Sequence, residues 1–211
     1  MQPREAADAP ERTFIETARR EQIVAAAIDT IAAVGYARAS LGRIAERVGI
    51  SRGLISYHFA GKDELIGEVV RQVLEQGIGY MRPRILAEST GPGTLRAYIE
   101  SNLAFMREHR NHLIAIVEIG RNGTTIDGQR VFYGDANVDE AVTILEQLLA
   151  RFQATGEFRR DFDPKVMAVA IRAAIDAIPP RLTFDPDLDI DNYAHQIATT
   201  FDLATRVNDT P

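Results

Sequence analysis

Residues 40–65 constrain the fold of this chain more than any other segment. Apolar residues recur there at intervals of three and four, which places them on one face of a helix. These residues are Leu41, Ile44, Ala45 and Val48. Gly49 suits the left-handed residue that ends a helix, and Ser51 is a favoured N-cap for the next one. Two short helices joined by a glycine-containing turn predict a helix-turn-helix, whose second helix can enter the major groove of DNA.

The second helix of this motif, residues 52–59, carries the side chains that could read a base sequence. The N-terminal residues of such a helix point at base edges. Here they are Arg52, Gly53, Leu54 and Ser56. Arg52 could pair with a guanine through two hydrogen bonds, the commonest specific contact. Ile55 and Phe59, four positions apart, are expected to face inward and hold the helix in place.

The same segment resembles the signature of the TetR family of bacterial transcriptional regulators. The residues that carry the resemblance are Ser51-Arg52-Gly53, Tyr57-His58-Phe59, Lys62, Leu65 and the upstream pair Gly35-Tyr36. The similar region covers roughly residues 15–66. It departs from the family at Ser56, where many members have an aromatic residue, so the resemblance does not give the operator sequence.

The resemblance also implies residues that clamp DNA phosphates, namely Ser40, Tyr57, His58 and Lys62. With the base-facing residues, the expected DNA-contacting set is Ser40, Arg43, Ser51, Arg52, Gly53, Leu54, Ser56, Tyr57, His58 and Lys62. The alternative interpretation is that Tyr57 and His58 only pack against or cap the helix.

The net charge of −6 is distributed unevenly along the chain. Residues 12–62 carry eight Arg and Lys against four Asp and Glu, whereas residues 63–211 carry 15 against 23. Positive charge therefore coincides with the helix-turn-helix, where it would favour DNA phosphates, and the acidic remainder would be held away from them. A segment of this charge is not rare, so the pattern supports the motif without establishing it.

The amino-acid composition argues against several other classes of protein. The chain has 45% hydrophobic residues and no cysteine, which excludes disulfides and thiolate metal sites. No apolar run approaches the roughly 18 residues that a membrane-spanning helix needs. The polar, Pro- and Ala-rich residues 1–12 have no apolar core of a secretion signal, so we expect a disordered tail and a cytoplasmic location.

Nearly every remaining segment predicts helix. The expected helices are residues 14–34, 41–48, 52–59, 62–80, 94–109, 111–120, 138–154, 164–177 and 190–207. Pro83 should limit the fourth helix, Thr94 should cap the fifth, and Pro179-Pro180 should stop the eighth. Residues 121–135, rich in Gly and Thr, predict a long loop.

These elements predict an all-α fold of about nine helices in two domains. Residues 13–61 would form an N-terminal three-helix helix-turn-helix DNA-binding domain. Residues 62–208 would form a C-terminal helical domain for ligand binding and dimerisation. The fourth helix would join the two.

Three patterns that mimic catalytic or metal sites are set aside. Residues 49–53 fit the G-x-S-x-G motif of serine hydrolases, but that motif needs a preceding strand and an amphipathic helix precedes it here. His109 and His112 have no carboxylate beside them in the sequence. The acidic run 185–191 lacks the glycine and glutamate of a calcium loop. We therefore expect no enzyme, no metal and no cofactor.

Two apolar stripes in the last helices predict a subunit interface. They consist of Met167, Ile171, Ala174 and Ile178 in one helix and Tyr193, Ile197, Phe201 and Ala204 in the other. Both could instead be intramolecular core. Because a helix-turn-helix reader generally needs two copies about one DNA turn apart to read a palindrome, a homodimer through a four-helix bundle is favoured. The resemblance implies the same assembly.

Polar and aromatic residues among the apolar helical stretches suggest a ligand cavity. The candidates are Phe105, Met106, His109, Glu118, Arg121, Phe132, Tyr133, Arg172 and Asp176. The alternative is that Arg172 and Asp176 form a structural ion pair and that Glu118 is solvated. That a cavity exists at all is an implication of the resemblance.

The expected function is a ligand-responsive, dimeric DNA-binding repressor. It would bind a palindromic operator in double-stranded DNA and be released by an unknown small-molecule effector. Two alternatives remain open: a DNA-binding activator or architectural factor without an inducer, and a small helical enzyme.

Overall fold

The computed structural model describes residues 9–122, 125–126, 129–130, 136–185 and 187–207, and within them the chain is helical apart from one short hairpin. The elements in chain order are α1 (Ala9–Val34), the 3-10 helix η1 (Tyr36–Arg38), α2 (Leu41–Val48), α3 (Arg52–His58), α4 (Lys62–Leu86), α5 (Gly91–Glu108), α6 (Arg110–Arg121), β1 (Thr125–Ile126), β2 (Gln129–Arg130), α7 (Ala136–Ala154), α8 (Pro164–Asp176), α9 (Ile178–Leu182) and α10 (Ile190–Thr205). The expected all-α fold is confirmed. None of the described helices is long and apolar enough to cross a membrane.

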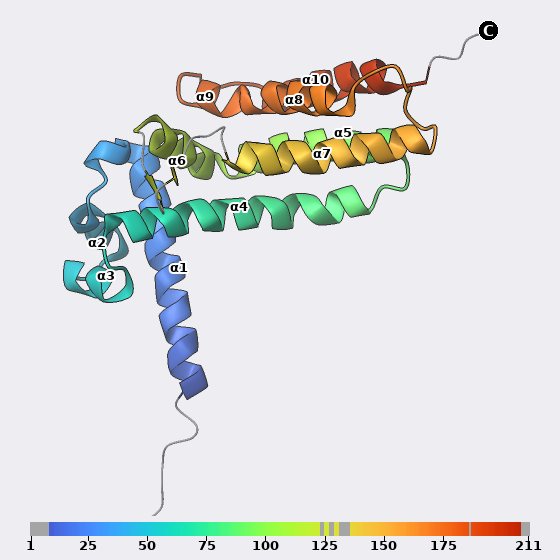
Figure 1. Ribbon diagram of the computed structural model, residues 1–211. Coiled ribbons are helices and arrows are strands. Elements are labelled where there is room, and N and C mark those ends of the chain that lie inside the picture. Colours follow the sequence, from blue (N-terminus) through green and yellow to red (C-terminus); the bar gives the residue numbers. More distant parts are fainter. Residues whose placement is uncertain (1–8, 123–124, 127–128, 131–135, 186, 208–211) are drawn as a thin grey trace, which may run out of the picture.

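Helices α1 to α3 and the start of α4 form a small unit, here called the head (Figure 1). The side chains at its centre are fully buried, and the largest of them are Ile23, Ile31, Ile44, Ile55, Phe59 and Leu65. This core continues without a break into α6 through Ala115 and Ile119. Because the head and α6 share one close-packed core, a movement of α6 must also displace side chains of the head.

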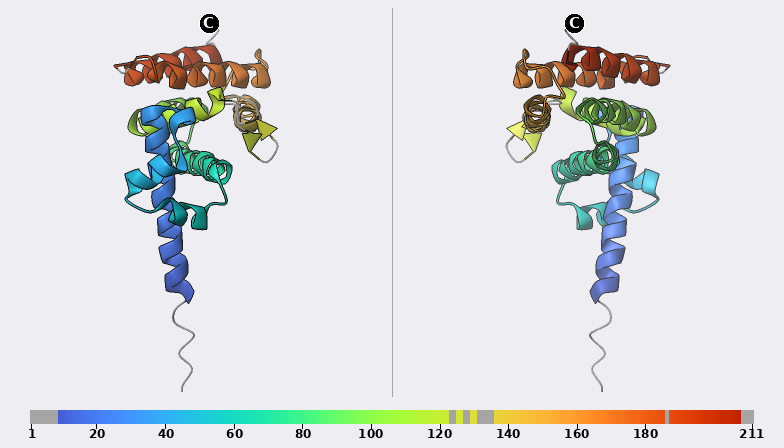
Figure 2. Two further views of the ribbon diagram at one scale, coloured as in Figure 1. Left: turned by 90° about the vertical axis from the view of Figure 1, so that its left-hand side faces the viewer. Right: turned by 90° about the vertical axis from the view of Figure 1, so that its right-hand side faces the viewer.

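The remaining helices form the larger unit, here called the body, in layers (Figure 1). Helix α4 lies on one side, α5 and α7 in the middle, and α8 with α10 on the far side. Their core contains Leu95, Ile99, Leu103, Leu145, Leu149, Ile171 and Ile175, all at most 1% exposed. Helix α1 crosses α4 near its start and reaches up to α6 (Figure 1 and Figure 2).

Helix α4 is longer than the sequence indicated. It passes Gly77, Gly79 and Pro83 and ends at Leu86. Gly77 is buried, and a side chain there would come within 3.4 Å of the Phe105 ring. That glycine therefore serves the close approach of α4 to α5 and does not end the helix. Pro83 lies in the last turn, so the backbone hydrogen bond that it cannot donate is lost close to the end of the helix.

Other boundaries also differ from the expected ones. Helix α1 begins at Ala9, so the tail expected over residues 1–12 overlaps it by four residues, and residues 1–8 lie outside the described part. Thr90 caps α5, since its side chain accepts from the Gly93 N–H, and Thr94 is an interior residue. Pro179 and Pro180 lie in the first turn of the additional helix α9, where proline needs no N–H. Within the expected loop, β1 and β2 pair antiparallel.

Candidate nucleic-acid interface

The turn between α2 and α3 has the geometry that the sequence predicted. The Ser40 side chain accepts a hydrogen bond from the Arg43 N–H at 3.3 Å and caps α2. Gly49 ends α2 with φ 74°, the left-handed conformation that glycine adopts without strain. The Ser51 side chain accepts from the Leu54 N–H at 3.2 Å and caps α3. The helix-turn-helix is therefore confirmed, and the two serine caps fix where α2 and α3 begin.

Helix α3 is held from its inner side. Ile55 and Phe59 are both buried, as predicted. The Arg20 guanidinium lies 4.2 Å from the centre of the Phe59 ring and donates a hydrogen bond to the His58 carbonyl at the end of α3. Arg20 thus holds α3 through a cation–π contact and a charged hydrogen bond. This role of Arg20 could not be predicted from the sequence, because Arg20 and His58 are 38 residues apart and no local pattern connects them.

The outer face of α3 is open to solvent. Arg52, Gly53, Ser56 and Tyr57 are exposed, and Leu54 and His58 are half-buried. Tyr57 is 72% exposed, an unusual position for a tyrosine that only packs, and its ring meets His58 edge-on at 5.1 Å. The α3 residues predicted to face DNA are thus accessible to solvent, Leu54 and His58 only in part.

The exposed arginines of α2 and α3 differ from those of the body in their partners. Arg43, Arg47 and Arg52 are exposed, and within the described residues none of them forms an ion pair. In the body, by contrast, Arg71, Arg96, Arg107, Arg159 and Arg172 all pair with carboxylates. Unpaired guanidinium groups keep their full charge for phosphates or base edges. Arg47 was missed by the sequence analysis, although its exposure beside Arg43 makes it an equal candidate.

Lys62 occupies a different position from the one expected for a phosphate contact. Its ammonium donates to the Tyr36 carbonyl at 2.8 Å and lies 3.9 Å from the centre of the Tyr36 ring. Burial lowers the pKa of Lys62, and the charge of Asp63 partly opposes this. The side chain therefore fastens η1 to the start of α4, and a phosphate would have to compete with that internal contact.

The turn before η1 is held by the body as well as by the head. The Tyr36 N–H donates to a Glu118 carboxylate oxygen at 3.3 Å, and the same carboxylate lies 3.8 Å from Arg121. Gly35, with φ 78° and ψ 158°, allows this approach, since a side chain there would come within 3.1 Å of the Glu118 carboxylate. A second link joins Asn111 to Asp29 at 2.8 Å. These contacts fix the angle between head and body.

The predicted dimer residues are buried or half-buried within their own subunit. Ile171 and Ile178 are 0% and 2% exposed and belong to the core of their own subunit, so predicting them at an interface was wrong. Partly buried Met167, Tyr193, Ile197 and Phe201 pack against that core, and Ala174 and Ala204 are half-buried. The exposed apolar side chains here are instead Val166 and Val169 on α8, Leu203 on α10 and Val207 just after α10, each at least 49% exposed. A helix buried on one side can thus carry a second apolar face.

The residues predicted to line one cavity are dispersed. Phe105 and Met106 are buried in the core of the body, and His109 stacks on Phe105 at 4.5 Å. Glu118 and Arg121 lie at the other end of α6 beside the head. Phe132 and Tyr133 lie outside the described residues.

Arg172 and Asp176 form the ion pair that the alternative interpretation described. The Arg172 guanidinium also donates to the Tyr98 hydroxyl at 3.1 Å and to Asn102 at 3.3 Å. Burial raises the pKa of Asp176, an effect that the charge of Arg172 opposes. The pair therefore ties α8 to α5 inside the body. In the described part of the chain, no three His, Cys, Asp or Glu side chains gather as metal ligands would.

Comparison with known proteins agrees with this geometry. Residues 23–69 match the family model of bacterial regulatory proteins, tetR family. The chain is 40% identical over 85 residues to the HTH-type transcriptional regulator BetI 1 of Chromohalobacter salexigens. That alignment covers 40% of this chain and 42% of the relative, so the chain spans less than half the length of the curated relative it matches.

Solved structures extend the likeness to the body. A structure described as the molecular basis for control of antibiotic production by bacterial hormones has a TM-score of 0.76 at 23% identity, over 90% of this chain and 98% of the other. AibR, solved with isovaleryl coenzyme A and operator DNA, has a TM-score of 0.71 at 21% identity, over 86% and 97% of the two chains. At such identities the fold is what is shared. Residues 23–69, in the head, are thus similar to the tetR family of bacterial regulatory proteins, and most of the chain shares the fold of these solved structures.

Proposed function

We propose that this chain is a ligand-responsive transcriptional repressor that binds a palindromic operator as a homodimer. The observation that carries the proposal is the outer face of the helix-turn-helix. There, exposed Arg43, Arg47 and Arg52 lack ion-pair partners among the described residues, on two helices whose caps and buried side chains fix their orientation. Such a rigid, positively charged helix pair suits the major groove of DNA.

The residues would divide into two roles. Arg52, Gly53 and Ser56 lie in the exposed first turns of α3, where side chains meet base edges. Ser40, Arg43, Tyr57 and His58 surround them and would contact the sugar–phosphate backbone, which positions the protein without reading sequence. Lys62 is a weaker candidate for a phosphate contact, because its ammonium is bound to the Tyr36 carbonyl.

The exposed apolar face of α8 and α10 supports a homodimer. Val166, Val169, Leu203 and Val207 leave this face uncovered within one subunit, and the two helices run side by side (Figure 1). Two copies packed through such faces would bury them and would present two α3 helices to successive major grooves.

An effector would bind in the body and act through α4. A groove of about 590 Å³ lies between the end of α4 and α7, a size typical of small-molecule sites. Ile85, Leu148 and Phe152 give it apolar walls, and Arg151 supplies a positive charge. The complex of AibR with both an acyl thioester and operator DNA supports a ligand of this kind acting on the same fold.

Release would follow from a shift between two arrangements of the heads. Helix α4 runs from the buried Leu65 of the head to the groove at Ile85. A ligand that binds better to the arrangement with wrongly spaced heads favours release, in proportion to its differential affinity. A coupling of about 1–3 kcal/mol would change operator affinity roughly 5- to 150-fold.

The proposal is tested by selecting bound sequences from random double-stranded DNA with the purified chain. The expected result is a palindrome with half-sites centred about 10 base pairs apart, or a multiple of that spacing. Selection of sequences with no shared half-site would overturn it. Repeating the binding with a metabolite library separates a ligand-responsive repressor from a regulator without an inducer, since only the former loses DNA on addition of one compound.

A further inference from the structure

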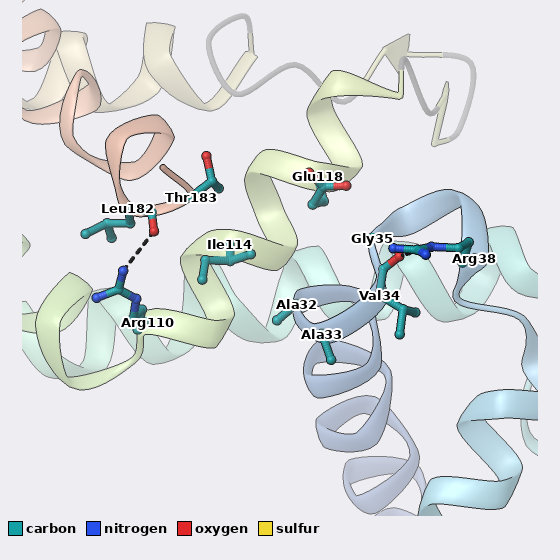
Figure 3. A pocket seen from close by; sticks show the side chains of 10 residues that line it. All are labelled: Ala32, Ala33, Val34, Gly35, Arg38, Arg110, Ile114, Glu118, Leu182 and Thr183. Atoms are coloured by element: carbon teal, nitrogen blue, oxygen red, sulfur yellow. Dashed lines mark hydrogen bonds between the residues drawn. The ribbon is translucent and has the colours of Figure 1, made fainter. Parts of the chain in front are cut away.

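A second groove lies at the seam between head and body, away from the one at the end of α4 (Figure 3). It has a volume of about 510 Å³ and is lined by the end of α1, by η1, by α6 and by the end of α9. Residues 32–38 of the head form one wall, and residues 110–118 of α6 face them. Its size is within the range of small-molecule sites. A molecule in this groove would therefore touch both units at once.

The middle of the groove is apolar, and its ends carry charge. Ala32 and Ala33 on α1, Ile114 on α6 and Leu182 on α9 form the apolar part. Arg110 stands at one end of the α6 wall, and Glu118 stands about 12 Å further along the helix, by the helical rise of 1.5 Å per residue. This leaves room for a short aliphatic body between two polar ends.

The positive charges in the groove outnumber its one carboxylate. At one end, the Arg110 guanidinium donates to the carbonyls of Leu182 at 2.8 Å and Asp185 at 3.3 Å, which fixes it in place. Glu118 at the other end is already shared by the Tyr36 N–H and Arg121. The groove is thus suited to an anion.

Arg38 supplies the most accessible of these charges. Its Nε donates to the Val34 carbonyl at 2.7 Å, which turns the guanidinium towards the groove (Figure 3). Within the described residues, its two terminal NH₂ groups have no acidic partner. A guanidinium fixed through Nε presents those two groups side by side, the geometry that a carboxylate accepts.

We propose that this groove binds a short aliphatic carboxylate, with the carboxylate on Arg38 and the chain against Ile114 and the two alanines. The bound acid joins a head residue to body residues and so stabilises this one arrangement of the two units. It is a second regulatory site, distinct from the groove between α4 and α7. The binding itself does not depend on the proposed function, whereas its effect on operator affinity rests on it.

The test uses butanoate, hexanoate and octanoate as probes, titrated calorimetrically into the intact protein without DNA. Hexanol and hexylamine are matched probes with the same chain and no negative charge. We expect saturable binding of at least one acid and none of the two neutral or cationic probes. Absence of saturable binding by all three acids, or equal binding of hexanol, would overturn the proposal.

Point variants test whether the acid binds in this groove. Arg38→Ala removes the carboxylate partner at an exposed position and should weaken acid binding about 10-fold. Ala33→Phe should block the groove by bulk while leaving its charges. Arg206→Ala, at an exposed arginine that lines neither groove, is the matched control and should leave the affinity unchanged. Arg151→Ala tests whether the acid binds in the other groove instead. If Arg151→Ala abolishes binding and Arg38→Ala does not, the acid belongs to the other groove and the inference is wrong.

A linkage experiment then tests the regulatory part. Because coupling between two ligands is reciprocal, a selected operator duplex should change the affinity for the acid by the same factor by which the acid changes operator affinity. If the affinity for the acid is the same with and without the operator, the regulatory part alone is refuted. Failure to bind DNA at all would refute the proposed function and leave the carboxylate site standing.

Discussion

Replacing Gly35 by alanine should destabilise the joint between head and body by a predictable amount. Gly35 has φ 78° and ψ 158°, a region that residues other than glycine enter at a cost of about 1–3 kcal/mol. The new methyl group would also come within 3.1 Å of the Glu118 carboxylate. That carboxylate must then move and weaken its hydrogen bond with the Tyr36 N–H, at about 0.5–1.5 kcal/mol.

The two effects together predict a loss of roughly 1.5–4.5 kcal/mol in the free energy of unfolding, measured by urea denaturation. For a chain of this length, that corresponds to a fall of roughly 3–18 °C in Tm. Gly79→Ala is the matched control, because Gly79 is helical and exposed, and a side chain there meets nothing within 4 Å. That control should stabilise the protein slightly.

A double-mutant cycle separates strain from contact. Glu118→Ala should cost more in the wild-type chain than in Gly35→Ala, since the Tyr36–Glu118 hydrogen bond is already weakened in the second background. The reasoning is refuted if Gly35→Ala proves as stable as Gly79→Ala, or if the cost of Glu118→Ala is the same in both backgrounds.

Three further predictions concern the dimer, the head and pH. Val169→Glu should convert the dimer to monomer in light scattering, whereas Ile78→Glu, an equally exposed change on α4, should not; a dimer that survives Val169→Glu would exclude the α8 face. Lys62→Ala should lower the free energy of unfolding by about 1 kcal/mol, because the contact with Tyr36 is lost, and an unchanged urea midpoint would contradict that role. Burial lowers the pKa of His112 below 6.5, the charge of His109 lowers it further, and the charge of Asp29 opposes both. The neutral His112 side chain therefore contributes its full stabilisation above pH 6.5, and this contribution is lost as the pH falls through the lowered pKa. With His112→Gln, the urea midpoint should decrease less as the pH falls below 6.5. An unchanged pH profile would show that His112 does not cause this decrease.

The sequence predicted the head well because its signals are local. Ser40, Gly49 and Ser51 act on backbone groups within three or four residues, so their roles follow from spacing alone. The contact of Arg20 with α3 spans 38 residues, and no spacing rule could reveal it.

The body was predicted less well because its details depend on packing between helices. The apolar spacing in α8 predicted the helix and indicated Ile171 as an interface residue, but the exposed apolar face of α8 is the one that carries Val169. Gly77 resembles a helix breaker in the sequence, yet it lies inside α4 against Phe105. The i, i+4 spacing of Arg172 and Asp176 correctly indicated a pair, whereas whether that pair lines a cavity depends on α5.

The measurement that tests the central claim most directly is the sequence preference of Arg52→Ala compared with that of the wild-type chain on a selected operator. If Arg52 reads a base, its removal should weaken specific binding by about 1–3 kcal/mol and relax the preference at one position of each half-site. Arg96→Ala, at a half-buried position in the body, is the control and should leave both unchanged. An Arg52→Ala protein with unaltered affinity and preference would contradict the claim that the outer face of α3 reads DNA.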